Sequence, residues 1–428
     1  MAEEAAISID PRIFISEPYI TCPKCSTKNF GVLIMTGGND NYTRRCTKCW
    51  YSQRFDLPVL EKHIIYLDQF AISNMMLALN AKLGKTEKVD KFWLKLFEKL
   101  ERLHRLQLIE IPDSTFHRTE SKLGKYAPLK KMYDHFSGGT TFLDAPTIRR
   151  FQVASKFRKL GGEKDTEITK DDVLENSHGS WGGRIYVTVD SKVDPKDVEA
   201  ERNARERIAD SLKATFERWQ KEKGMAFPDW FKEEGLAWGK AMSQRYAQAL
   251  VNYGQAIENG TSAFDPSTFF EFWDEQVLVH SLITFAPGKD RHEKFMAVVN
   301  FLSSEEMLDI PFNEIAASLW AAIAHQAAHG GRKLPPNRGM ASDVEMISTL
   351  LPYVDAMLVD REMAGLLSFG DVQRKIAKYD TKILSLADKE DIFGYLDSIE
   401  AKMTPQHLKL VEEVYGKDWV KPYLEMYE

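Results

Sequence analysis

The stretch SDVEMISTLLPYVDAMLVDRE, residues 342–362, decides the fold that we expect for this chain. Its first half carries apolar residues at a spacing near 3.6 and stops at Pro352, which disfavours helical geometry in the residue before it. We therefore expect a short helix that begins at Asp343. The continuous apolar run 356–359 then predicts a strand that is buried on both faces of a parallel sheet. Asp360 follows directly, at the sheet edge where α/β proteins bind their ligands.

Two other stretches repeat this pattern. HIIYLDQFAISN, residues 63–74, predicts a strand that ends at Asp68 and leads into a helix. LQLIEIPDSTFHRTES, residues 106–121, predicts a second strand and then a helix with Glu120 in its second turn. The strongly amphipathic helix expected over 88–106 joins the two strands. A strand, helix, strand order of this kind implies a parallel sheet.

These stretches supply four carboxylates: Asp68, Glu120, Asp343 and Asp360. Because the carboxyl ends of parallel strands meet at one edge of a sheet, we expect the four side chains to converge there. Such a cluster needs a cation, either an arginine or a metal ion. Hard oxygen ligands without His or Cys favour Mg²⁺ or Mn²⁺ over zinc. Asp355, before the last strand, fits a turn or cap residue as well as a fifth ligand.

All four cysteines lie in two CxxC motifs. Cys22 and Cys25 form the first motif, and Cys46 and Cys49 form the second. Two such knuckles aim four thiolates at one point, the arrangement that binds zinc tetrahedrally. Two disulfides, or a redox CxxC that has no need of a copy, are the disfavoured alternatives. We expect a zinc ribbon over 18–58. Its basic and aromatic residues suit contacts with nucleic acid, and equally they suit a role in offsetting thiolate charge and packing a small core.

The composition is that of a soluble globular protein, with 43% hydrophobic and 28% charged residues. A length of 428 residues allows two or three domains. The net charge of −6 gives no general attraction to nucleic acid or membranes, so a polyanionic partner must be met by local basic patches. The acidic start MAEEAAISID has no apolar signal segment, and no apolar window is long enough to span a bilayer. We expect a cytoplasmic protein with no membrane contact.

A mainly helical insertion is expected over 151–309, and residues 184–189 read as one further strand. The glycine pairs of this region lack the spacing of a phosphate-binding loop. After an apolar helix over 313–328, the segment GGRKLPPNRG, residues 330–339, is a basic loop stiffened by proline. It brings cations close to Asp343. Cations beside carboxylates suit a metal-dependent enzyme that acts on a polyanion; the alternative is a simple surface connection.

His325 and His329 lie four residues apart on the helix expected over 313–328. Zinc proteases use such a pair, but they need a glutamate directly after the first histidine, where this chain has Gln326. Metal binding by the pair is therefore disfavoured.

The order of these motifs resembles a PIN-like nuclease domain. The resemblance rests on LDQFAISN, DSTFHRTES and NRG..SDVEMISTLLPYVDAMLVD, covers roughly 60–125 and 310–400, and looks like a bacterial branch fused to a zinc ribbon. It implies an α/β three-layer fold with a central parallel sheet, a large all-α insertion and a small N-terminal zinc ribbon. The four acidic positions of the family are matched by Asp68, Glu120, Asp343 and Asp360. Val359 stands where the family usually has Thr or Ser, and the long insertion is atypical.

What the resemblance implies is a nuclease in which one or two Mg²⁺ or Mn²⁺ ions, held by these carboxylates, activate water for in-line attack on a phosphodiester. Nucleic acid is then the expected partner, RNA more than DNA, and a toxin-like or phage-defence role follows from the resemblance alone. A homo-oligomer or a regulatory protein partner stays open. The candidate substrate contacts are Arg338, Arg332, Arg361, Asn74 and His117.

The expected domain order runs from a lead-in at 1–17 and the ribbon at 18–58 to a PIN-like domain in two parts, 59–150 and 310–428, around the insertion. Two other functions stay open. One is a non-catalytic module that binds nucleic acid or a ribonucleoprotein through the ribbon. The other is a hydrolase of small phosphoesters. This function would leave the zinc ribbon and the helical insertion without a role.

Overall fold

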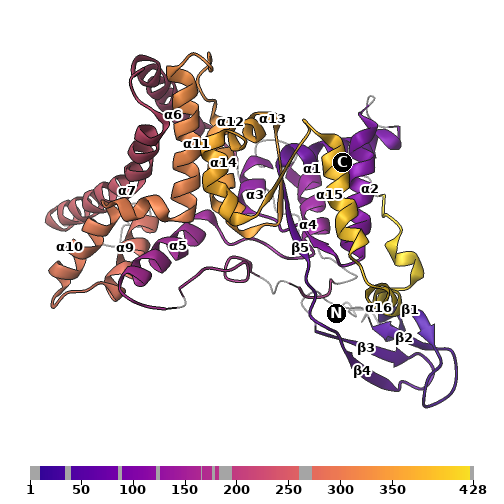
Figure 1. Ribbon diagram of the computed structural model, residues 1–428. Helices are drawn as coiled ribbons and strands as arrows, with labels where there is room; N and C mark the ends of the chain where they lie inside the picture. Colours follow the sequence, from indigo (N-terminus) through magenta and orange to yellow (C-terminus); the bar gives the residue numbers. More distant parts are fainter. Residues whose placement is uncertain are drawn as a thin grey trace, which may run out of the picture. The chain divides into compact units, whose positions relative to one another are not determined.

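The chain folds into two compact units (Figure 1). Unit 1 consists of Met1–Phe142, Leu174–Lys192 and Leu384–Glu428, and unit 2 of Leu143–Val173 and Val193–Ile383. The strand expected over 184–189 lies outside the described residues. The computed structural model describes residues 10–33, 40–84, 89–121, 126–164, 166–175, 179–182, 195–259 and 272–424.

Unit 1 begins with an antiparallel sheet in the order β1-β2-β3-β4. Its strands are β1 (Ile15–Ile20), β2 (Phe30–Leu33), β3 (Asn41–Cys46) and β4 (Ser52–Asp56). A 3-10 helix over Pro11–Phe14 precedes the sheet, so ordered structure already begins inside the segment that was expected to be a lead-in. Along β3 every second residue is buried, which gives the strand one inner face bearing Tyr42, Arg44 and Cys46.

The second part of unit 1 confirms the expected parallel pairing. Strands β5 (His63–Leu67) and β6 (Ile109–Glu110) pair in parallel, with His63 opposite Ile109. Between them the chain forms α1 (Gln69–Lys82) and α2 (Lys91–Arg105). The last four residues of β5 are at most 2% exposed, so both faces of the strand are covered. The other elements of unit 1 are α3 (Thr115–Ser121), α4 (Tyr126–Ser137), α15 (Lys389–Ala401), α16 (Pro405–Tyr415) and the 3-10 helix η5 (Lys417–Val420).

Unit 2 is mainly helical, and its bounds differ from those of the insertion expected over 151–309. Its larger helices are α5 (Ala145–Leu160), α6 (Pro195–Lys221), α7 (Phe227–Glu258), α9 (Trp273–Phe285), α10 (Arg291–Leu302), α11 (Pro311–Ala328) and α12 (Arg338–Leu350). Its shorter elements are η2 (Glu305–Asp309), η3 (Leu351–Tyr353), β7 (Ala356–Val359), α13 (Arg361–Leu367), α14 (Gly370–Ile376) and η4 (Ala377–Tyr379). Strand β8 (Lys382–Ser385) runs from unit 2 into unit 1. Strand β7 has the bounds that the apolar run predicts, and all of its residues are buried.

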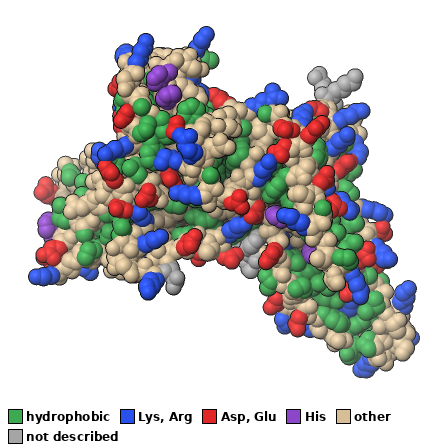
Figure 2. Space-filling model, in the orientation of Figure 1, with side chains coloured by type: hydrophobic (Ala, Val, Ile, Leu, Met, Phe, Trp, Pro, Cys, Tyr) green, Lys and Arg blue, Asp and Glu red, His purple; other side chains and the backbone are tan. Residues whose placement is uncertain are grey.

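On the surface, basic and acidic side chains are interspersed on the face that Figure 2 shows, in keeping with a net charge of −6 spread over 428 residues. Within the ranges that the structure describes, no helix combines the length and the apolar character needed to cross a membrane.

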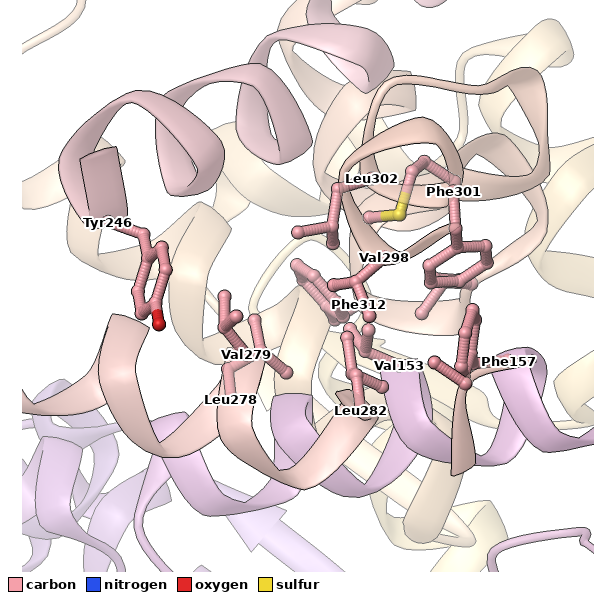
Figure 3. Close-up of a cluster of buried hydrophobic side chains, with 13 residues drawn as sticks. Val153, Phe157, Tyr246, Leu278, Val279, Leu282, Val298, Phe301, Leu302 and Phe312 are labelled. Carbon is pink, nitrogen blue, oxygen red and sulfur yellow. The ribbon is translucent and has the colours of Figure 1, made fainter. Parts of the chain in front are cut away.

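One hydrophobic core cluster of unit 2 forms where α5, α7, α9, α10 and the start of α11 meet (Figure 3). Side chains such as Phe157, Leu282 and Phe301 interdigitate there and are almost fully buried. A Cβ on Gly239 of α7 would lie 1.9 Å from the carbonyl oxygen of Leu302, at the end of α10. A glycine is therefore required at this crossing, because any side chain would force the two backbones apart.

The helix of the opening stretch begins earlier than expected. Helix α12 starts at Arg338 and is capped by Asn337, whose side chain accepts the N–H of Met340 at 2.9 Å. Asp343 therefore lies inside the helix and does not begin it. Asparagine and aspartate cap helices equally well, and nothing between the two positions stops a helix, so the earlier cap sets the start.

Candidate functional site

The four cysteine sulfurs form a cluster in unit 1. All four lie within 4.8 Å of one another, and the Sγ atoms of Cys22 and Cys49, and of Cys25 and Cys46, are 3.6 Å apart. A tetrahedron with Zn–S bonds of about 2.3 Å has sulfur-to-sulfur edges of about 3.8 Å, whereas a disulfide bond measures about 2.05 Å. All four cysteines are free thiols in this geometry. The cluster fits one tetrahedral zinc ion, as the spacing predicts.

The two knuckles that carry these cysteines have the same backbone. The N–H of Ser26 donates to the carbonyl of Cys22 at 2.9 Å, and the N–H of Trp50 donates to the carbonyl of Cys46 at 3.0 Å. Ser26 and Trp50 both adopt left-handed backbone angles, with φ of 58° and 60°. The repeated turn shows that each CxxC motif presents its two thiols in the same way, which four-thiolate zinc sites require.

The basic residues of the ribbon play different roles. Arg44 is 2% exposed and donates to the backbone carbonyls of Pro18, Phe30 and Glu413, the last at 2.5 Å. It is therefore a structural link between the ribbon and α16, and not a surface cation. Arg45, by contrast, holds its guanidinium 5.1 Å from the centre of the Trp50 ring, which is 37% exposed. This part of the ribbon keeps the character that nucleic-acid contact needs.

Asp68 lies where β5 ends and α1 begins. The N–H of Phe70 donates to its Oδ1 at 3.4 Å, so Asp68 is the N-cap of α1, and its side chain is half-buried. Asn74, on the same helix, donates its side-chain amide to the carbonyl of Phe70, one turn before it, at 2.7 Å. The side-chain amide of Asn74 is therefore bonded to the helix backbone. A contact between Asn74 and substrate stays a prediction.

Glu120 lies on α3, and His117 holds that helix against β5. Nε2 of His117 donates to the carbonyl oxygen of Leu67 at 2.7 Å, and Leu67 is the residue before Asp68. The imidazole is also stacked between two tyrosine rings, with centroid distances of 4.7 Å to Tyr66 and 4.6 Å to Tyr133. His117 is 2% exposed, so its ring is packed inside the protein, and its contact with substrate stays a prediction. Its position fixes the helix of Glu120 next to the strand of Asp68.

The charges of Asp68 and Glu120 both affect the pKa of the two buried tyrosines in this stack. Burial first, and then the negative charges of Asp68 and Glu120, raise the pKa of Tyr66 well above its usual range. Burial and the charges of Asp113, Glu120 and Asp68 likewise raise the pKa of Tyr133. Both carboxylates therefore influence this stack, Asp68 from the end of β5 and Glu120 from α3. That Asp68 and Glu120 share one site stays a prediction.

His117 gives a direct test of this arrangement. We expect His117→Phe to keep the stacked ring but to leave the buried carbonyl of Leu67 without its donor, at a cost of about 1–3 kcal/mol in the free energy of unfolding. His117→Ala also removes the ring and leaves a cavity, at a cost of about 3–5 kcal/mol. Urea unfolding of the two variants measures the difference. Equal stability of His117→Ala and the wild type would contradict the assigned role.

The other two predicted acids lie in unit 2. Asp343 is half-buried within α12, and Asp360 follows β7 and caps α13 by accepting the N–H of Met363 at 2.7 Å. Asp360 and Asp68 thus occupy equivalent places, after a buried strand and before a helix. Asp355 forms an ion pair with Lys170 at 2.6 Å, which favours its reading as a structural residue. That all four carboxylates converge stays a prediction.

Two of the predicted arginines line one pocket of unit 2. The pocket has a volume of about 500 Å³, and its lining includes Arg332, Lys333, Arg361 and Glu362. Arg332 is 13% exposed and pairs with Glu362 at 2.9 Å. Arg338 is exposed at the first position of α12 and does not belong to the lining. The basic loop thus lines part of this pocket, and its predicted role in substrate binding stays a prediction.

Comparisons with family models, curated proteins and solved structures give no match to this chain. The PIN-like resemblance therefore rests on the motifs quoted above. What the structure itself shows is a mixed α/β fold with a parallel strand pair and a four-cysteine cluster that fits zinc.

Proposed function

We propose that this protein is a nuclease that hydrolyses phosphodiester bonds in RNA, or less favourably in DNA, with Mg²⁺ or Mn²⁺. The observation that carries the proposal is that His117 of α3 bonds to the residue before Asp68, while the charges of Asp68 and Glu120 both act on the tyrosine rings stacked on His117. Both side chains are half-buried, so they are reachable from solvent. Carboxylate oxygens are the ligands that Mg²⁺ and Mn²⁺ prefer.

In this proposal each residue has a defined task. Asp68 and Glu120 would hold the ion, and the sequence adds Asp343 and Asp360 to the ligand set. A divalent ion bound there would lower the pKa of water and polarise a phosphoryl oxygen. His117 is a positioning residue, because it acts through the placement of α3.

The Mn²⁺ affinity of the Glu120→Gln variant tests the proposal without relying on turnover. We expect Glu120→Gln to bind Mn²⁺ about tenfold or more weakly than the wild type, since even residues that merely orient a metal ligand change affinity by about 10–100-fold. Electron paramagnetic resonance of free Mn²⁺ in a titration of zinc-loaded protein gives the affinity. Glu98→Gln, a matched change at a partly exposed residue of α2, is the control. Equal affinities of the two variants would remove Glu120 from the site.

A second candidate function is a non-catalytic module that binds nucleic acid through the ribbon. The exposed ring of Trp50 with the guanidinium of Arg45 above it favours this candidate. A cleavage assay distinguishes the two functions, because a binding module would bind nucleic acid without cutting it.

A further inference from the structure

Asp113 lies where β6 leads into α3, and its carboxylate is buried among hydrogen-bond donors. The residue is 5% exposed. Its Oδ1 accepts the N–H of Ser114 at 2.7 Å, and its Oδ2 accepts the Nε–H of Arg118 at 2.8 Å. Its backbone forms a parallel bridge with Thr141, in the segment that follows α4. Asp113 is therefore held on two sides, by the start of α3 and by the segment that pairs with it.

The carboxylate of Asp113 also faces the buried ring of His117. Nδ1 of His117 lies 3.4 Å from Oδ1 of Asp113, and Nε2 lies 2.7 Å from the carbonyl oxygen of Leu67. Among the described residues Nδ1 has no hydrogen-bond partner, which leaves the contact with Asp113 to satisfy it. Burial raises the pKa of Asp113, but its contacts with His117 and Arg118 outweigh burial and lower the pKa overall, so Asp113 is negatively charged at neutral pH.

Both nitrogens of the His117 ring therefore face groups that only accept hydrogen bonds. A neutral imidazole has a single N–H, so one of its nitrogens would point a lone pair at an acceptor inside the protein, where an unsatisfied polar group is costly. An imidazolium has an N–H on each nitrogen and satisfies both Leu67 and Asp113. The geometry of the contacts thus favours the charged ring.

The surroundings of the ring also suit a cation. The rings of Tyr66 and Tyr133 stack on it at centroid distances of 4.7 and 4.6 Å, and the face of an aromatic ring attracts positive charge. The negative charges of Asp68 and Glu120 act on the same tyrosines. The opposing charge is that of Arg118, whose side chain is 42% exposed and is therefore screened by solvent.

We propose that Asp113 is a positioning residue of the nuclease site, because it holds a second proton on His117 and makes the hydrogen bond from His117 to Leu67 charge-assisted. A charge-assisted hydrogen bond is about twice as strong as a neutral one. Leu67 precedes Asp68, so this bond fixes the backbone that presents the Asp68 carboxylate. The effect on metal binding rests on the proposed function, whereas the charge of the ring does not.

Nuclear magnetic resonance of the His117 ring at neutral pH tests the charge directly. The protein is the full zinc-loaded chain with isotope-labelled histidine, and His117→Phe identifies the signals of His117. We expect the wild type to carry a hydrogen on both ring nitrogens, and Asp113→Asn to keep only the hydrogen on Nε2. Arg118→Gln, which removes the other cation beside Asp113, should keep both hydrogens. A wild-type ring with a single hydrogen, or loss of the second hydrogen in Arg118→Gln, would overturn the proposal even if Asp113→Asn does not fold.

The affinity for Mn²⁺, measured as for Glu120→Gln, tests the positioning role. We expect Asp113→Asn to bind Mn²⁺ about tenfold more weakly than the wild type, at the lower end of the range for groups that orient a metal ligand. Asp90→Asn is the matched control, since Asp90 accepts the N–H of Phe92 at the start of α2 and pairs with Lys389. Equal affinities of the two variants would refute the positioning role.

The two readouts separate this inference from the proposed function. A doubly protonated ring in a wild type that binds no Mn²⁺ would contradict the nuclease, and the positioning role with it. A singly protonated ring in a wild type that binds Mn²⁺ would overturn this inference alone.

Discussion

Replacing Asp68 with Asn is expected to reduce metal-dependent cleavage about 100-fold or more, the scale on which one lost electrostatic contact slows an enzyme. The substitution keeps the shape of the side chain but removes the negative charge that, in this proposal, would hold a divalent ion. Asparagine caps helices as well as aspartate does, so α1 keeps its N-cap. The fold should therefore stay intact, while metal binding and the rate of cleavage both fall.

The matched control for this variant is Asp388→Asn. Asp388 caps α15 in unit 1 by accepting the N–H of Asp391 at 2.9 Å, so it undergoes the same chemical change in the same structural role. Initial rates with a labelled substrate and thermal melting curves are compared for the wild type and both variants. Unchanged cleavage by Asp68→Asn, or an equal loss in Asp388→Asn, would contradict the role assigned to Asp68.

Removing the metal from the four-cysteine cluster is expected to unfold the ribbon. The core around the cluster is small, with Cys22, Phe30 and Cys46 as its buried residues. Such a core stabilises little by itself, whereas zinc contributes about 10–16 kcal/mol in small zinc domains at pH 7. We expect Cys46→Ala to lose its zinc and to expose the first strands to protease.

The loss should also reach α16. Arg44 of β3 donates to the carbonyl of Glu413, so an unfolded ribbon withdraws a hydrogen bond from that helix. Elemental analysis should give one zinc per wild-type chain and none in Cys46→Ala. Hydrogen exchange should then show faster exchange in β1 to β4 and in the last turn of α16. Ser52→Ala, at an exposed residue of β4, should keep both the metal and the protection. A metal-free Cys46→Ala with wild-type protection would show that the cluster is not structural.

The parts of the fold that the sequence predicts correctly are those with a local pattern. The apolar run of β7, the strand of β5 and the repeated CxxC spacing each lie within a few residues, so no distant partner decides them. The predicted start of α12 was wrong because two equivalent capping residues, Asn337 and Asp343, lie within one short segment.

The contacts that the sequence did not reveal join residues far apart in the chain. Tyr66, His117 and Tyr133 form one stack, although each is an ordinary residue in its own segment. Tyr66 lies on β5, His117 on α3 and Tyr133 on α4, and no single segment shows that the three rings meet. The buried role of Arg44 is likewise set by a carbonyl group of α16, and a backbone carbonyl leaves no mark in the sequence.

The measurement that tests the nuclease proposal most directly is cleavage by the zinc-loaded wild-type protein. Labelled single-stranded RNA, structured RNA and single-stranded DNA are each incubated with Mn²⁺, with Mg²⁺ and with EDTA. We predict cutting that needs the metal, is fastest on single-stranded RNA and disappears in Asp68→Asn. Tight binding of any of these substrates without cutting, under every metal condition, would contradict the nuclease and would favour the binding module.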